Sequence, residues 1–379
     1  MDRFRLQKAL EQGVDQGVFP GGVLLVARGG GDPALVTAGT LDRGPGSPGA
    51  SAATVYDLAS LTKILSTTIL TMVFLDRGLL DLDDPLSRLW PGRVPEDKQG
   101  ITLRRLLAHD SGFPAWRPFY ESLVLLPESE RRSAAAEAIL REPLEARPGA
   151  RAVYSDLNFL LLGFILEKLG GRRQERLFED LVAGPLGLTS TGYRALDRPR
   201  GPNRGLAPTE DVPRRGGVIL GEVHDDNAWS LAGVAGHAGL FAPAVEIWRI
   251  FAELRRAFRG ETNCLGLVPG TVRVFWTRDG TAPGSTRALG FDMPSAVDSS
   301  AGRLFSRLGV GHLGFTGTSL WHDPERDLTV ILLTNRVHPT AANQSIKTFR
   351  PYMHDEVVKA VFPARGEPPF PPPGLGLVG

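Results

Sequence analysis

The stretch GHLGFTGTSLWHDPERDLTVILLTN, residues 311–335, decides the fold of this chain. Apolar and β-branched runs lie on both sides of the polar group DPERD, which predicts two or three antiparallel strands that turn at DPERD. A similar pair of runs lies near the N-terminus, where GGVLLVARGG (21–30) and ALVTAGT (34–40) predict a hairpin. We therefore expect the strands of both chain ends to share one sheet.

Between these strands the apolar residues recur at helical spacing, from about residue 60 to 258, and a final helix is expected from about 340 to 361. The pattern predicts an α/β (α+β) fold, in which an antiparallel sheet built from both chain ends is flanked by helices and encloses a mostly helical domain. We expect an α/β sheet domain of residues 1–60 and 235–365, a helical domain of residues 61–234, and a Pro- and Gly-rich tail of residues 366–379.

Composition excludes several classes of function. The chain has 379 residues, of which 42% are hydrophobic, so it can bury a large core. Its formal net charge of +1 leaves no basic excess for nucleic acid. The longest apolar runs fall short of the roughly 20 residues of a membrane-spanning helix, so no membrane partner is expected. A single cysteine, Cys264, and an amphipathic rather than signal-like start indicate a cytoplasmic protein.

A possible nucleophile lies in YDLASLTKIL, residues 56–65, where Ser60 and Lys63 are three residues apart. Residues at this spacing share one face of a helix, so the lysine amine would point back to the serine hydroxyl. A partly desolvated lysine can accept a proton, and the helix N-terminus favours an oxyanion on the attacked carbonyl. The alternative interpretation is that Ser60 caps the helix and Lys63 extends its amine to solvent.

Two further stretches favour the catalytic interpretation. With the Ser60 stretch, RPGARAVYSDLNFLLLG (147–163) and GVGHLGFTGTSLW (309–321) resemble, in order and spacing, the three motifs of the serine β-lactamase and penicillin-binding-protein superfamily. SLTK matches the first motif, YSD the second, usually Tyr-x-Asn, and HLG the third. The detailed similarity is to class C β-lactamase-like serine hydrolases of the esterase-like branch. This resemblance implies a β-lactamase/transpeptidase-like fold.

The resemblance also implies roles for individual residues. Ser60 would be the acyl-accepting nucleophile, and Lys63 and Tyr154 its proton partners; which of the two is the base stays open. The backbone N–H groups of Ser60 and Phe315 would form the oxyanion hole.

Two positions depart from the lactamase motifs. His312 replaces a lysine and would hydrogen-bond into the Ser–Tyr–Lys network, or have only a structural role. Asp156 replaces an asparagine. We expect Asp156, His312 and Gly314 to contribute to this network or to substrate binding. Loss of the third-motif lysine removes a cation suited to the β-lactam carboxylate.

The remaining histidines and carboxylates carry weaker signals. His224 and Asp225 in GEVHDDNA are metal-ligating types, but their spacing fits no zinc pattern, and the role of this loop stays open. His109 and His237 lie in small-residue turns, where close packing or a local hydrogen bond is expected. We therefore predict no metal site.

These observations predict acyl transfer without metal or organic cofactor: Ser60 attacks a small-molecule ester or amide, and water releases the acyl-enzyme. The expected enzyme is carboxylesterase-like. Alternatives in the same class are a D,D-peptidase, a D-aminopeptidase or a weak β-lactamase. Other classes are a penicillin-binding or sensor protein that does not turn over its ligand, and a metal-dependent hydrolase. The oligomeric state is left open.

Overall fold

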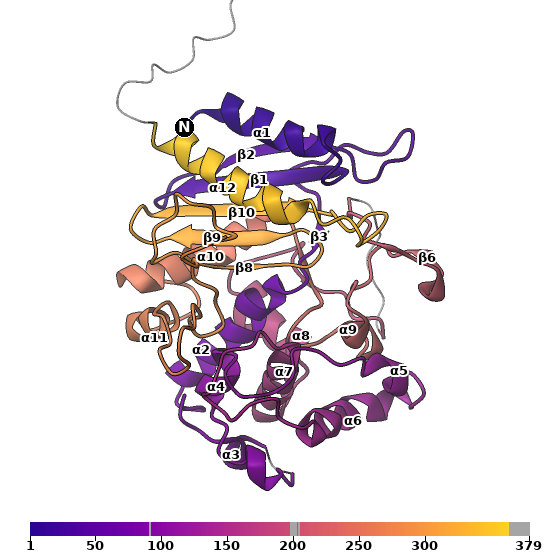
Figure 1. The fold of residues 1–379 in the computed structure, drawn as a ribbon, viewed down its shortest axis with the longest axis vertical. Coiled ribbons are helices and arrows are strands. Elements are labelled where there is room, and N and C mark those ends of the chain that lie inside the picture. The colour runs from indigo at the N-terminus through magenta and orange to yellow at the C-terminus, as the bar shows by residue number, and fades with distance from the viewer. Residues whose placement is uncertain (91, 198–202, 204, 364–379) are drawn as a thin grey trace, which may run out of the picture.

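The computed structural model of the chain describes residues 1–90, 92–197, 203 and 205–363, so the predicted tail, 366–379, lies outside the described residues. A five-stranded antiparallel sheet, in the order β2-β1-β10-β9-β8, crosses its upper half in Figure 1. Its strands are β1 (Gly21–Arg28), β2 (Ala34–Gly39), β8 (Val310–Leu313), β9 (Ser319–Asp323) and β10 (Leu328–Thr334).

The two chain ends pair at the centre of this sheet. Strand β1 runs antiparallel to β10, with Val23 opposite Leu333 and Arg28 opposite Leu328, and it pairs on its other side with β2. Strands β8, β9 and β10 follow one another as antiparallel neighbours. Both the predicted hairpin and the shared sheet are therefore confirmed.

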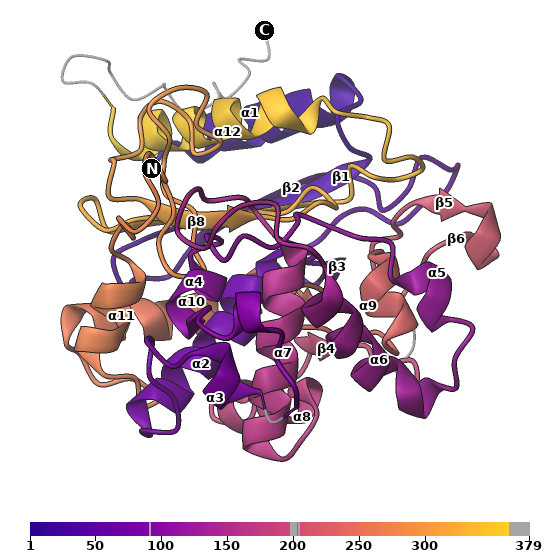
Figure 2. The same ribbon diagram turned by 60° about the horizontal axis from the view of Figure 1, so that its bottom comes forward.

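Helices cover both faces of the sheet, which explains why its central strands are apolar at successive positions. Val23 and Leu25 belong to a large core on one face, whereas Leu24 and Val26 belong to a smaller core on the other. Alternate side chains of a strand point to opposite faces, so a strand buried on both sides is hydrophobic throughout. The smaller core is closed by α1 (Arg3–Asp15) and α12 (Ile346–Val361), which lie together above the sheet in Figure 2.

The other face carries α10 (Ala244–Arg259), and the remaining α-helices lie on the same side of the sheet (Figure 1). These are α2 (Thr68–Asp76), α3 (Leu86–Leu89), α4 (Leu103–Leu107), α5 (Tyr120–Leu123), α6 (Glu128–Arg141), α7 (Asp156–Gly170), α8 (Gln174–Phe178), α9 (Asp226–Ser230) and α11 (Pro269–Phe275). Short π segments occur at η1 (Lys63–Thr67) and η3 (Glu179–Ala183), and 3-10 turns at η2 (Glu96–Lys98) and η4 (Pro213–Arg215). Among the described helices, none has the length and apolar character needed to cross a membrane.

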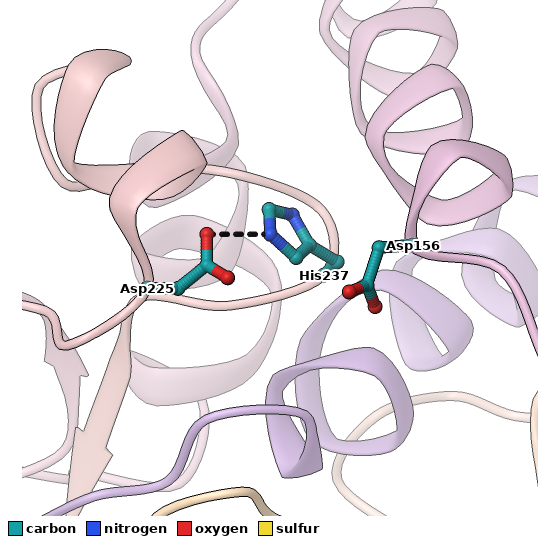
Figure 3. Close-up of side chains that lie close together, drawn as sticks. All are labelled: Asp156, Asp225 and His237. Carbon is teal, nitrogen blue, oxygen red and sulfur yellow. Dashed lines mark hydrogen bonds and ion pairs between the residues drawn. The ribbon is translucent and has the colours of Figure 1, made fainter. Parts of the chain in front are cut away.

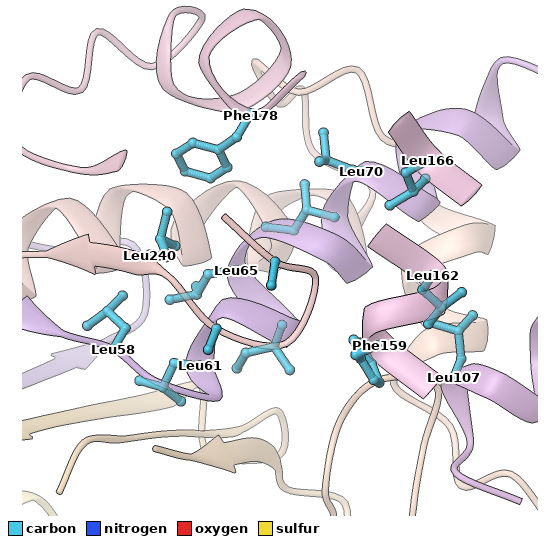
Figure 4. Close-up of a cluster of buried hydrophobic side chains, with 14 of the residues drawn as sticks. Leu58, Leu61, Leu65, Leu70, Leu107, Phe159, Leu162, Leu166, Phe178 and Leu240 are labelled. Carbon is cyan, nitrogen blue, oxygen red and sulfur yellow. The ribbon is translucent and has the colours of Figure 1, made fainter. Parts of the chain in front are cut away.

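The helix that follows Ser60 lies inside the large core. Leu61 and Leu65 on this helix belong to the same buried cluster as Phe159 and Leu162 of α7 and Leu240 (Figure 4). Each of these side chains is almost completely buried. Packing on several sides fixes the axis of this helix, and with it the direction in which Ser60 and Lys63 point.

Two small sheets complete the fold. One joins β3 (Tyr56–Asp57), β7 (Leu240–Ala242) and β4 (Gly192–Tyr193), and the other pairs β5 (Asp211–Val212) with β6 (Gly217–Val218). Because β3 pairs with β7 immediately before Ser60, the start of the first motif is held by backbone hydrogen bonds as well as by packing.

The last helix begins later than the sequence predicts, at Ile346 rather than near residue 340. Asn343 donates from its side-chain amide to the backbone carbonyls of Gly17 and Val18 and accepts a hydrogen bond from the Ser345 backbone. An asparagine that bonds to the backbone in this way competes with helix formation. The segment before Ile346 is therefore tied to the N-terminal region instead of extending α12.

Candidate active site

Ser60 lies where the chain leaves β3 and enters the buried helix. The residue before it, Ala59, has a positive φ of 47°, an uncommon conformation for a residue with a side chain. The carboxylate of Asp57 accepts a hydrogen bond of 2.8 Å from the Ala59 backbone and so supports this turn. As a result Ser60 is partly exposed and lines a cavity of about 620 Å³.

Lys63 lies directly beneath Ser60 and has no exposed surface. Its ammonium group donates to Ser60 Oγ at 2.9 Å, to the Tyr154 hydroxyl at 2.7 Å and to Asp156 Oδ1 at 2.7 Å. A fourth, longer contact of 3.3 Å reaches the carbonyl oxygen of His237. The interpretation in which Lys63 extends to solvent is therefore wrong, because its amine is enclosed by polar partners inside the protein.

Tyr154 completes a triangle with Ser60 and Lys63, since its hydroxyl donates to Ser60 Oγ at 2.7 Å. Burial raises the pKa of Tyr154 to about 12, although the neighbouring Lys63 opposes that rise. Burial alone would lower the pKa of Lys63, but the charges and hydrogen bonds of Asp156 and Tyr154 outweigh it, so the Lys63 pKa is raised. At neutral pH the resting site thus contains a phenol and an ammonium group.

The second motif is positioned by the start of α7. Ser155 caps this helix, accepting a 3.4 Å hydrogen bond from the Asn158 backbone. Its own backbone N–H donates to His109 Nδ1 at 3.0 Å, and its hydroxyl donates to the carbonyl of Pro114 at 2.6 Å. The segment that contains His109 therefore fixes the turn on which Tyr154 and Asp156 stand. The His109 ring also packs against the rings of Tyr154 and Phe159, so close packing, one of the two expectations for it, is confirmed.

The third motif, at the end of β8, packs directly against the first. Thr316 donates from its hydroxyl to the carbonyl of Asp57, and Thr318 donates to that of Leu58. Gly314 lies so close that an added Cβ would collide with Thr318 Oγ1 and would be 2.5 Å from the Leu58 carbonyl oxygen. The backbone of residues 314–318 can therefore touch the backbone before Ser60 only because residue 314 has no side chain.

His312 differs from one expectation for the third motif. Among the described residues no hydrogen bond joins it to Ser60, Lys63 or Tyr154; its Nδ1 instead bonds the Leu313 carbonyl at 2.8 Å. Its ring lies beside that of Tyr154, with 5.7 Å between the ring centroids. Burial lowers the pKa of His312 to about 4, so the ring is neutral near pH 7.

The GEVHDDNA loop supplies residues that sequence reasoning did not assign. Its His224 backbone donates to Asp57 at 2.7 Å, and Asp225 bonds His237 Nε2 at 2.8 Å (Figure 3). Burial would raise the pKa of Asp225, but the adjacent His237 outweighs it and the pKa lies below its usual range. Asp57 was not predicted from the sequence, where its one signal is that it is a lone acidic residue in the apolar run YDLAS.

Asp156, Asp225 and His237 also form a group whose potential ligand atoms lie within 4.8 Å of one another (Figure 3). Two interactions already use this group: the ammonium of Lys63 bonds Asp156, and His237 bonds Asp225. The cation that Asp156 faces in the structure is therefore Lys63, and the partner of Asp225 is His237.

Aromatic and basic side chains form the walls of the cavity. Trp116 and Phe315 are both exposed and line it, and the Phe315 ring contacts the ring of His224 and the guanidinium of Arg336. Arg287 lies over the ring of Tyr154, 5.2 Å from its centroid, and is paired with Asp292. The cleft thus offers a planar apolar surface beside several cations.

Comparison with known proteins agrees with this arrangement. A family model described as Beta-lactamase matches residues 6–350. A protein of Escherichia coli K12 named "Putative D-alanyl-D-alanine carboxypeptidase" is 32% identical over 316 residues, which cover 78% of this chain and 72% of that protein.

Two solved structures show the same fold, and the predicted fold class is confirmed. EstCE1, a hydrolase with promiscuous acyltransferase activity, superposes with a TM-score of 0.72 at 23% identity, covering 94% of this chain and 98% of its own. SurE with D-Leu superposes with a TM-score of 0.70 at 25% identity, covering 94% and 75%. On the family match and the relative from Escherichia coli, the chain belongs to the β-lactamase family of serine hydrolases.

Proposed function

We propose that this protein is a serine hydrolase that forms an acyl-enzyme on Ser60. The observation that carries the proposal is the triangle of hydrogen bonds between Ser60 Oγ, Lys63 Nζ and the Tyr154 hydroxyl, each 2.7–2.9 Å long. A serine hydroxyl becomes a competent nucleophile when neighbouring groups take its proton as it attacks. Lys63 and Tyr154 are the groups that contact this hydroxyl directly.

The proposed oxyanion hole consists of the backbone N–H groups of Ser60 and Phe315. Within the described part of the chain, neither N–H makes a hydrogen bond, and both residues line the same cavity. An unpaired N–H beside a nucleophile can stabilise the negative charge that develops on the attacked carbonyl oxygen. The contact of Gly314 with Leu58 keeps the two segments at a fixed separation.

The substrates of the family are small-molecule esters or amides, and we propose a carboxylesterase-like preference for uncharged esters here. Support comes from His312, which is buried and neutral near pH 7 where the lactamase motif has a lysine. The planar faces of Trp116 and Phe315 offer an apolar surface for an acyl or leaving group.

A second candidate is a D,D-peptidase that removes a residue with a free carboxylate. The name of the Escherichia coli relative favours it, and so do two cations that line the cleft, Arg336 and Lys347. Among the described residues, neither of these cations forms an ion pair. The two candidates share the same nucleophile and differ only in the group bound beside it.

A fluorophosphonate probe tests the shared mechanism. We expect the probe to add one adduct at Ser60, and Ser60→Ala to abolish both labelling and ester hydrolysis. Loss of the attacking oxygen should reduce kcat by about 10⁴-fold or more, because only substrate binding and the oxyanion hole would then contribute to catalysis. Near-normal turnover by a folded Ser60→Ala protein would overturn the proposal, and a single product per chain in the wild type would indicate a sensor.

A further inference from the structure

A continuous chain of hydrogen bonds leads from Ser60 to a carboxylate. Lys63 Nζ touches Ser60 Oγ at 2.9 Å on one side and Asp156 Oδ1 at 2.7 Å on the other. The Lys63 side chain is fully buried, and that of Asp156 is 16% exposed. No bulk water therefore separates the three groups along this path.

The identity of residue 156 matters because an asparagine, which the resemblance leads one to expect there, cannot accept a proton. In the resting site the ammonium of Lys63 already carries its full set of protons, and Tyr154 is a phenol. Neither can take the serine proton without first losing one of its own. Among the groups along this path of hydrogen bonds, the Asp156 carboxylate, which touches Lys63, is the one that still has a free proton-accepting site.

We propose that Asp156 is the final acceptor of the Ser60 proton, which reaches it through Lys63. This proposal rests on the proposed function, in which Ser60 is the nucleophile. Asp156 does not touch the reacting atoms, so it acts on Ser60 through Lys63, which it positions and whose proton it accepts. Tyr154 stays a neutral phenol and donates its hydrogen bond to Ser60 Oγ.

The step balances without any further reactant. Asp156 takes one proton from Lys63, and the lone pair freed on Nζ takes the proton of the Ser60 hydroxyl as Oγ bonds the carbonyl carbon. When the bond to the leaving group breaks, its oxygen or nitrogen takes a proton from Lys63, and Asp156 returns its proton to Lys63. The carboxylate and the ammonium are restored, and the leaving group has gained the hydrogen that Ser60 lost.

Other ionisable groups surround Lys63 and Asp156, and they are the same in the variants proposed below. They are Tyr154, His109, His237 and its partner Asp225, His312, and Arg287 with its partner Asp292. A change in pH dependence that follows substitution of residue 156 alone therefore reports on Asp156 and Lys63.

The test is the pH profile of kcat/KM for a p-nitrophenyl ester with Asp156→Asn. We expect a loss of about 100- to 10,000-fold at pH 7, the range typical of a lost general base. Activity should recover as the pH rises, because solvent can then take the proton that Lys63 must lose. Asp156→Glu, which keeps a carboxylate, should retain more activity at pH 7 than Asp156→Asn.

Asp327→Asn is the matched control, since Asp327 also forms an ion pair with a buried arginine, Arg255, but lies in the β9–β10 turn. The Asp327→Asn protein should have a lower melting temperature than the wild type and the same pH profile of kcat/KM. An Asp156→Asn enzyme as active as wild type at pH 7 would overturn the proposal, because a free Lys63 amine would then suffice. A folded Asp156→Asn enzyme whose kcat/KM is reduced by the same factor at every pH would also overturn the proposal. If instead the fluorophosphonate fails to label Ser60 in the wild type, the proposed function itself is wrong.

Discussion

At the scale of single residues, the site depends on burial of a cation beside two hydroxyl groups. Lys63 is enclosed with Tyr154 and Asp156, so its charge is set by these neighbours and not by solvent. In such an arrangement Lys63 and Tyr154 act as one unit, and removal of either residue should disable the same proton transfer.

This coupling predicts a strongly non-additive pair of substitutions. Tyr154→Phe and Lys63→Met, which keep the shape of the buried side chains, should each lower the acylation rate by about 100-fold or more. The double variant should be hardly slower than the worse single variant. Stopped-flow acylation with a p-nitrophenyl ester measures all three rates. A double variant whose loss equals the product of the single losses would show that one residue acts independently.

The sequence pointed to the residues of the three motifs but not to the second layer around them. Ser60, Lys63 and Tyr154 were predicted, and the structure brings them together within hydrogen-bond distance. The bond from His224 to Asp57 joins residues 167 positions apart, and neither residue has a spacing that reveals it. Contacts of this kind depend on how elements pack, so a pattern along the chain does not contain them.

At the scale of elements, the third motif holds the first in place through close backbone contact. Gly314 allows the turn after β8 to touch Leu58, and Thr316 and Thr318 add hydrogen bonds across the same interface. The two proposed oxyanion donors, Ser60 and Phe315, lie on opposite sides of this contact. Their separation should therefore be sensitive to a single added methyl group.

Gly314→Ala tests this sensitivity. The new Cβ would collide with Thr318 and approach the Leu58 carbonyl, so we expect a loss of stability of about 1–3 kcal/mol and a larger fractional loss of kcat. Gly270→Ala in α11 is the matched control, because nothing lies within 4 Å of its added Cβ. Thermal denaturation and ester hydrolysis measure the two effects. Unchanged kcat in Gly314→Ala would argue against Phe315 as an oxyanion donor.

Element types were predicted better than their ends. The hairpin of β1 and β2 and the strands β8 to β10 follow from β-branched runs and turn residues. The helix expected to open at Ser60 instead continues from Lys63 as a π segment, and α12 starts at Ile346 because Asn343 bonds to the N-terminal region. Tertiary hydrogen bonds decide such boundaries. The division at residues 60 and 234 into sheet and helical domains stays a prediction.

At the scale of the whole molecule, the pairing of β1 with β10 joins the chain ends and leaves the long middle segment to build the cleft. Ser60 follows the N-terminal strands, Tyr154 comes from the helical block and Phe315 from the returning strands. The shared sheet was predictable from the β-branched apolar runs and turn residues at both ends of the chain. The walls of the cleft could not be predicted from the sequence, because they combine side chains from loops of different segments.

The shape and charge of this cleft lead to a prediction about substrates. A lysine at the position of His312 would offer a charge-assisted hydrogen bond, which contributes about 1.5–3 kcal/mol, or about 10- to 100-fold in kcat/KM. Burial lowers the pKa of His312 to about 4, so above that pH the ring carries no charge and this contribution is missing. We expect a short-chain p-nitrophenyl ester to be hydrolysed with a higher kcat/KM than a chromogenic cephalosporin or a D-Ala-D-Ala peptide.

The three substrates should be compared at pH 7 on one enzyme preparation, with and without EDTA, and with Ser60→Ala as the background. Peptide turnover above ester turnover would favour the D,D-peptidase, and would mean that Arg336 and Lys347 replace the missing lysine as carboxylate ligands. The chelator has a specific target in the group of Asp156, Asp225 and His237. Because Lys63 already supplies the positive charge at Asp156, activity should be the same in EDTA, and a loss there would overturn the serine mechanism in favour of a metal-dependent one.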